Sequence, residues 1–242
     1  VHRNLDYQDV LASMKVCKAF HEALPNAVED IRVEKAITQA TLQYLCCTFH
    51  NLKNLTIHPE YDDHNPRLDF SNLHFPVLQS LEVANTPVTT LVFTSNNTPK
   101  LQRLSIEQQT SPLRSFRLDL PELETLSLEH LTVHDCSDFA PSLAACPKLR
   151  TFVSYKFWGP DDDVYDLRLP ECEDLSLTRC DGLGGLRLWA PKLTSLDLQG
   201  CFGLRKLQLL DVDPRSQQQQ PQERQEERQQ QEEQQADNTS AG

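Results

Sequence analysis

The sequence predicts an α/β solenoid, a fold in which short coils of chain stack along one axis. Leucines recur as L-x-x-L-x-L triplets, three times in succession between Leu183 and Leu209. Both leucines of each L-x-L pair point to one face of a strand, because side chains alternate along it. One such unit cannot bury its own apolar face, whereas a stack of units can.

A longer template, P-x-L-x-x-L-x-L, repeats through the chain and sets the length of the coil. An earlier copy without the proline occupies residues 50–57. Proline is tolerated here because it precedes the strand and need not donate to the ladder. Successive prolines lie 21 to 26 residues apart, a period typical of leucine-rich repeats. The copies begin at Pro76, Pro99, Pro121, Pro147, Pro170 and Pro191.

Residues 1–25 precede the repeats and are expected to form helical structure that caps the first coil. Apolar residues recur there at helical spacing, and Pro25 is expected to end the helix. A short strand at Asp30–Val33 and a helix at Ile37–Phe49 are expected next. His50–Ile57 then opens the repeats proper.

A second set of L-x-L-like segments predicts strands on the return side of the coils, so that both walls are rich in strands. One repeat differs, because Cys136–Cys146 carries apolar residues at helical spacing, with Ser137 or Asp138 as a possible cap. The expected return strands are Leu91–Phe93, Phe116–Leu118, Leu167–Leu169, Leu186–Leu188 and Leu207–Leu209.

The composition changes abruptly at Asp213. Residues 216–235 are almost entirely Gln, Glu and Arg, which leaves nothing to bury in a core and predicts a disordered tail. The expected organisation is therefore a cap at residues 1–25, a solenoid at 26–212 and a tail at 213–242.

Composition excludes several classes of partner. The net charge of −12 argues against a nucleic-acid backbone or an anionic membrane surface as the partner. The sequence contains no run of about 18 apolar residues, so no membrane span is expected. No basic-then-apolar segment that would indicate a leader peptide follows Val1.

The eight cysteines include no C-x-x-C pair. Cys180 and Cys201 share one template position, which favours small buried thiols and a reducing compartment over disulfides.

No pattern in the sequence indicates an enzyme, a cofactor or a metal site. His130, His134 and Cys136 have the right ligand types for zinc, but a fourth ligand is missing. Phosphate-binding, dinucleotide-binding and nucleophile-elbow motifs are missing as well.

Two groups of residues are candidates for binding a partner. Arg117, Arg168 and Arg187 occupy the centres of return strands, and Arg168 and Arg187 are expected on adjacent rungs as part of a basic stripe for an acidic or phosphorylated segment. Phe157 and Trp158 precede Gly-Pro and three acids, which predicts a rim loop with aromatic anchors. The alternatives are a solvated outer face for the arginines and inward packing for the aromatics.

The segment Val16-Cys17-Lys18-Ala19-Phe20 resembles the last helical segment of an F-box, whose pattern is V-C-K-x-W/F. Leu24 follows it, as in that family. The leading L-P and the first two helices of the motif do not precede it in this sequence. With repeats directly behind it, the chain resembles an F-box leucine-rich-repeat protein.

The resemblance implies the substrate-recognition subunit of an SCF-type cullin–RING E3 ubiquitin ligase. Val16, Cys17, Lys18 and Phe20 would contact the Skp-type adaptor, through which a cullin is reached. The repeats would hold a protein destined for ubiquitin-dependent degradation, in the cytoplasm or the nucleus. Such a subunit performs no chemistry itself.

Two other functions stay open. The first is a repeat scaffold unconnected to ubiquitin, with residues 1–25 as a plain cap. The second is an extracellular receptor-type repeat, which the glycosylation patterns at Asn54 and Asn96 would suit but the lack of a leader and of paired-cysteine caps disfavours.

Overall fold

The computed structural model describes most of the predicted solenoid. The described residues are 5–8, 12, 18–62, 64–107, 113–132, 138–156 and 163–211. The predicted tail at 213–242 and about half of the predicted cap segment at 1–25 lie outside them. Within this part the chain forms a parallel β-solenoid of about seven turns, so the prediction of a solenoid is confirmed.

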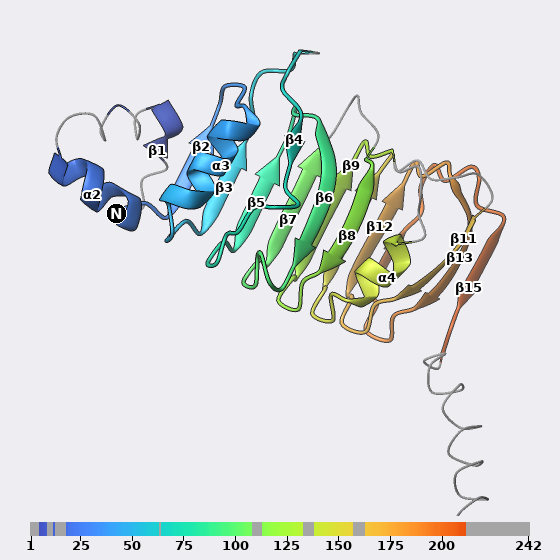
Figure 1. The fold of residues 1–242 in the computed structure, drawn as a ribbon. Helices are drawn as coiled ribbons and strands as arrows, with labels where there is room; N and C mark the ends of the chain where they lie inside the picture. The colour runs from blue at the N-terminus through green and yellow to red at the C-terminus, as the bar shows by residue number, and fades with distance from the viewer. Residues whose placement is uncertain are drawn as a thin grey trace, which may run out of the picture.

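The longer of the two walls is a nine-stranded sheet in which every neighbouring pair is parallel (Figure 1). Each coil of the solenoid adds one strand, so strands adjacent in the sheet come from successive coils. In spatial order the strands are β1 (Leu5–Asp6), β2 (Asp30–Val33), β3 (Asn54–Ile57), β5 (Ser80–Val83), β7 (Arg103–Glu107), β9 (Thr125–Glu129), β10 (Thr151–Tyr155), β12 (Asp174–Thr178) and β14 (Ser195–Asp197).

The repeated leucines of the template stack on one another across this wall. Leu81 lies opposite Leu55 and Leu104, and Leu126 continues the same row. All four are buried, because the alternation of the strand turns them to the interior. Every strand therefore covers the apolar side chains of the strands before and after it.

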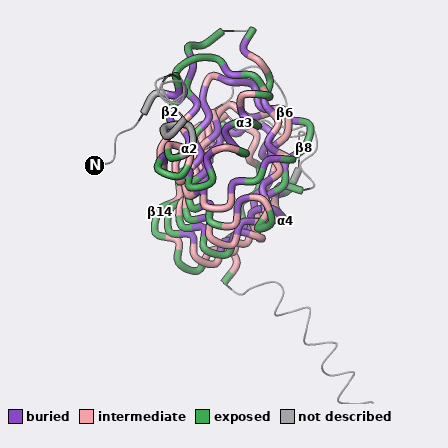
Figure 2. The backbone as a smooth tube through the Cα atoms, turned by 60° about the vertical axis from the view of Figure 1, so that its left-hand side comes forward, coloured by how far each residue is buried: buried purple, intermediate pink, exposed green. Residues whose placement is uncertain are grey.

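The return wall is built from two short parallel sheets of three strands each. In the turned view of Figure 2, buried residues lie between the two walls and exposed residues lie on the outside. One sheet contains β4 (Leu68–Asp69), β6 (Val88–Thr94) and β8 (Ser115–Asp119). The other contains β11 (Asp163–Arg168), β13 (Leu183–Trp189) and β15 (Lys206–Leu209).

Helix α4 (Phe139–Ala144) lies between these two sheets, as the spacing of residues 136–146 predicts. Its Phe139 ring packs within 5.3 Å of Phe116 and 6.1 Å of Phe152, measured between ring centroids. A helix cannot extend the ladder of β8, but the Ser142 hydroxyl accepts a hydrogen bond of 3.0 Å from the Leu118 backbone N–H. Asp138 occupies the N-cap position, yet its side chain forms no capping bond.

Helix α3 (Gln39–Thr48) precedes the second coil and matches the helix expected at residues 37–49. The Thr38 hydroxyl accepts a hydrogen bond from the Thr41 backbone N–H at 3.2 Å, which satisfies one of the free donors at the start of the helix. Leu42 and Leu45 are buried against the interior.

Helix α2 (Lys18–Ala27) corrects one boundary. Pro25 lies inside it, so the expected end of the helix at Pro25 is wrong, and the helix runs two residues further. For residues 18–22 the structure describes the backbone alone. The capping role of this segment stays a prediction.

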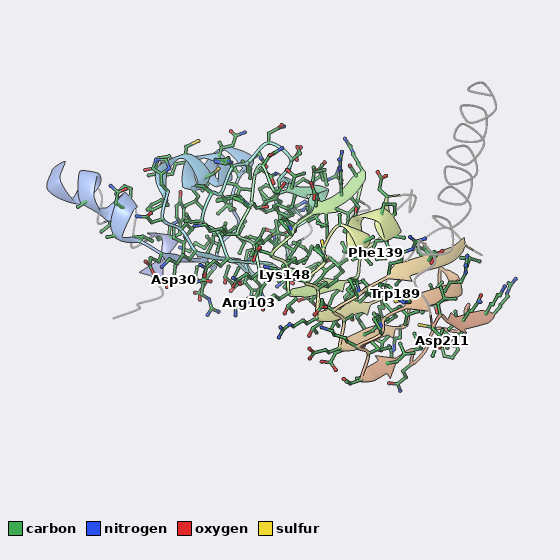
Figure 3. The ribbon with its side chains drawn as sticks, turned by 90° about the horizontal axis from the view of Figure 1, so that it is seen from below. Asp30, Arg103, Phe139, Lys148, Trp189 and Asp211 are labelled. Carbon is green, nitrogen blue, oxygen red and sulfur yellow. The ribbon has the colours of Figure 1, made fainter. Side chains whose placement is uncertain are left out.

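The last coil of the described chain is less covered than the others. Leu207 and Leu209 on β15 are 46% and 59% exposed, and Leu196 on β14 is only partly buried. Figure 3 shows Asp30 and Asp211 at opposite ends of the stack, with this coil beside Asp211. Its inward side chains have a neighbouring coil on one side alone within the described residues.

Leu126→Ala should lower the free energy of unfolding by about 2–5 kcal/mol, because the Leu126 side chain is fully buried. The same change at Leu209 should cost well under half as much, since that side chain is already more than half exposed. Urea unfolding followed by circular dichroism measures both. Equal losses would contradict burial by stacked neighbours.

Ser142→Ala should destabilise the protein by about 1–3 kcal/mol, because it leaves the buried Leu118 N–H without its acceptor. Ser115→Ala on β8 is the matched control, since Ser115 is exposed and the change should be nearly neutral. Thermal unfolding of the two variants compares them directly.

Candidate functional site: a hollow at the carboxyl edge of the long wall

The predicted arginine stripe is not continuous in the structure. Asp166 lies opposite Arg187, whereas Arg168 lies opposite Trp189, so the expected pairing of Arg168 with Arg187 is wrong by two residues. Arg187 forms an ion pair with Asp166 at 3.4 Å. Exposed Arg117 lies on β8, which α4 separates from the strands that carry the other two arginines.

The remaining candidates cannot be placed as side chains. Phe157, Trp158, Val16 and Cys17 lie outside the described residues. Lys18 and Phe20 belong to α2, of which only the backbone is described at these positions.

The outer face of the long wall carries short polar side chains along its centre and charged side chains among and beside them. Thr56, Ser105, Ser127 and Ser176 follow one another along the middle of the strands, interrupted by Glu82 and Val153. Helices α3 and α4 lie on the return side of the molecule, away from this face (Figure 1). The face is thus extended and polar in the described part of the chain.

The carboxyl edge of this wall carries a repeated backbone feature that the sequence analysis missed. Five residues have positive φ angles of 52° to 75°, and each lies five positions after the first residue of its strand. Residues other than glycine rarely adopt this backbone conformation, and asparagine does so more readily than most. The five residues are Asn85, His130, Lys156, Arg179 and Gly200.

Hydrogen bonds between coils hold this conformation in place. The backbone N–H groups of His130, Lys156 and Arg179 donate to carbonyl oxygens of the next coil at 2.7, 3.0 and 2.8 Å. The ladder therefore continues past the ends of the strands, and it brings three side chains with basic groups to the same edge.

These basic side chains gather around Tyr155, the last residue of β10. The His130 ring meets the Tyr155 ring edge-on, with centroids 5.2 Å apart. The Lys156 ammonium lies 5.4 Å from the same centroid, and the Arg179 guanidinium carbon lies 5.8 Å from it. Both distances are typical of cation–π contacts, which are worth about 0.5–1 kcal/mol at exposed sites.

Beside this cluster the surface contains a hollow of about 680 Å³, which we call the carboxyl-edge hollow. Residues of the last three long-wall coils line it. Phe202 forms part of its rim and is 91% exposed, the highest value among the large apolar side chains of the described chain. The lining residues are Tyr155, Lys156, Thr178, Arg179, Asp181, Gln199, Gly200 and Phe202.

The cations of this hollow are not neutralised within the described chain. Neither Lys156 nor Arg179 forms an ion pair with a described residue, whereas Lys53, Lys148, Lys192 and Arg187 all do. Asp181 is the single acid among the lining residues of the hollow. The carboxyl-edge hollow is therefore a basic, aromatic surface on a chain whose net charge is −12.

Gly200 shapes the hollow through its missing side chain. Its φ is +75°, and a Cβ placed on it would lie 3.0 Å from Cγ of Arg179. The absence of a Cβ lets the aliphatic part of Arg179 lie against the backbone of the next coil, and this contact helps to fix the direction of the side chain.

A second hollow, of about 800 Å³, lies at the same edge near the start of the stack. Its lining includes both Arg32 and Glu34, which form an ion pair at 3.1 Å. Glu60 and Asp62 add further negative charge to the lining. Its lining carries two basic side chains, Arg32 and Lys35, against the three acids Glu34, Glu60 and Asp62. This hollow is therefore less suited to attract an anion than the carboxyl-edge hollow, which has two basic side chains and one acid.

The buried thiols of Cys146 and Cys172 lack the low pKa of a reactive cysteine. Burial raises the pKa of the Cys146 and Cys172 thiols to about 11, so both stay protonated at neutral pH. Cys180 and Cys201 are not joined by a disulfide, and the Cys201 Sγ donates to the Leu177 carbonyl oxygen at 2.8 Å.

The described residues contain neither a cluster of metal ligands nor a membrane-spanning helix. No group of three His, Cys, Asp or Glu side chains is placed to hold a metal ion in this part of the chain. No helix in it combines the length and the apolar character needed to cross a bilayer.

Gly200→Ala should lower stability by about 1–2 kcal/mol, because alanine is strained at a φ of +75°. Gly200→Asn adds the same Cβ but tolerates this conformation better, so its loss should be smaller. Thermal melting of both variants tests the assignment. A larger loss for the asparagine variant would contradict it.

Comparisons with protein-family models, with curated proteins and with solved structures find no match for this chain. They therefore add no relative from which a site could be transferred. The function proposed next rests on the geometry of the wall and its hollow, together with the resemblance carried by residues 16–20.

Proposed function

We propose that this chain is a leucine-rich-repeat module that binds a polypeptide through the outer face and carboxyl edge of its long wall. The observation that carries this proposal is the face itself, which is nine parallel strands wide and carries polar and charged side chains on its described strands. Extended surfaces of this kind in repeat proteins bind polypeptides, whereas small substrates are usually held in enclosed apolar pockets.

The repeat assignment is supported by the period of 21 to 26 residues and by the inward row of leucines. Several return segments are strands instead of helices, so the coil is flatter than an α/β repeat. A strand returns the chain with few residues, which agrees with the short period.

We further propose that the module is the substrate-recognition subunit of an SCF-type cullin–RING E3 ubiquitin ligase in the cytoplasm or nucleus. Support comes from the F-box resemblance of Val16, Cys17, Lys18 and Phe20. The order of β2, α3 and β3 after this segment also agrees with the start of F-box leucine-rich-repeat proteins. In this role the N-terminal segment recruits the Skp-type adaptor and the cullin, while the wall holds the substrate.

The protein expressed from its own gene with a C-terminal tag should co-purify with a Skp-type adaptor and a cullin. Val16→Glu combined with Phe20→Glu should reduce adaptor recovery at least tenfold, because charges would enter the contact implied by the resemblance. Arg117→Glu, on the far wall, is the control and should leave recovery unchanged. Quantitative mass spectrometry of the purified complexes measures all three.

Recovery of neither adaptor nor cullin with the unmodified protein would exclude the ligase. A polypeptide-binding scaffold unconnected to ubiquitin would then be the function of the wall.

A further inference from the structure

We propose that the carboxyl-edge hollow binds a short acidic segment of the polypeptide partner. One carboxylate or phosphate lies between Lys156 and Arg179, and a neighbouring apolar side chain of the partner packs on Phe202. This inference rests on the proposed polypeptide-binding function and names the chemistry of its ligand.

Lys156 and Arg179 are placed to share one anion. Tyr155 and Thr178 lie opposite each other on neighbouring strands, and Lys156 and Arg179 are the residues that directly follow them. Neighbouring strands lie about 4.8 Å apart in a sheet. Their charged groups both lie within 6 Å of the Tyr155 ring centroid. A single carboxylate or phosphate has several acceptor oxygens and can accept from both groups.

The electrostatics of the site favour such an anion. Two like charges on neighbouring rungs repel each other, and in the described chain no ion pair offsets this repulsion. An incoming anion removes the repulsion and gains two charge-assisted hydrogen bonds. Each cation also contacts the Tyr155 ring, which limits the freedom of both side chains and so reduces the entropy lost on binding.

The surroundings limit the length of the anionic stretch. Glu129 lies opposite Tyr155 on the next strand, and Glu107 lies opposite Glu129. These carboxylates follow the basic cluster along the same edge, so a long polyanion such as a nucleic acid would be repelled within about 10 Å of Lys156. A partner segment fits best with acidic groups over β10 and β12 and with basic or neutral groups over β7 and β9.

Phe202 adds an apolar requirement. It stands 91% exposed on the rim of the hollow, and a ring so exposed is a suitable anchor for an aliphatic or aromatic side chain. The expected motif therefore combines one or two acids with an adjacent large apolar residue.

A selection from a random dodecapeptide library displayed on phage tests the motif with the full chain as bait. Peptides enriched on the unmodified protein should contain Asp or Glu next to a large apolar residue. Enrichment of peptides without acids would overturn the proposal, as would no enrichment at all.

The best peptide, labelled with fluorescein, should then bind in fluorescence anisotropy at least tenfold more weakly to a Lys156→Met, Arg179→Met double variant. Arg114→Met removes an exposed arginine beside β8 on the other wall and should leave the affinity unchanged. Phe202→Ser should weaken binding several-fold with the salt dependence retained. Equal affinity for the double variant and the unmodified protein would refute the role of the two cations.

Versions of the peptide with phosphoserine or with Asn in place of Asp separate the sources of the anion. Tighter binding of the phosphoserine peptide assigns a phosphorylated partner, and tighter binding of the Asp peptide assigns an acidic one. Equal binding of the Asn peptide would overturn the proposal.

The Lys156→Met, Arg179→Met double variant should still recover the adaptor, because the ligase role does not need the hollow and the hollow does not need the adaptor. This measurement keeps the two proposals distinct.

Discussion

Burial of each coil by its neighbours is the constraint on which this structure depends. Leucines such as Leu81 and Leu104 leave water only because the strands on both sides carry an equivalent side chain in register. The requirement fixes the parallel direction of the strands and the nearly constant length of the coil. It also allows α4 to replace a return strand, since a helix can cover the same interior when Ser142 satisfies the ladder that it interrupts.

Features set by burial could be predicted from the sequence. The period of the prolines and leucines located the long-wall strands, and the change to helical spacing located α3 and α4. The register of β11 against β13 could not be predicted, because a shift of two residues keeps the same leucines inside. Tyr165 therefore lies opposite Leu186, where pairing of Arg168 with Arg187 would place Leu167. Leu167 is still buried and lies opposite Leu188.

The carboxyl-edge hollow was missed for a different reason. Its side chains come from three coils, and each looks like an ordinary loop residue when the sequence is read alone. The positive φ angles of His130, Lys156 and Arg179 follow from bonds between coils, and local residue preference gives no sign of them. Gly200 was the one available signal, since it stands 21 residues after Arg179 at the equivalent position. In a repeat fold each template position recurs on every rung, and adjacent positions meet at the same edge. The edge can therefore carry acids on some strands, as at Glu107 and Glu129, and bases just beyond the ends of others, as at Lys156 and Arg179.

The partly covered last coil has a consequence for recognition. Within the described residues Leu207 and Leu209 gain less from burial than the leucines in the middle of the stack, so opening of this coil costs less free energy than opening of a middle one. Gln199, Gly200 and Phe202 belong to the same coil and also line the hollow. A ligand that contacts these residues binds only while the last coil is folded. By thermodynamic linkage, its binding must therefore stabilise the last coil of the described stack against local unfolding.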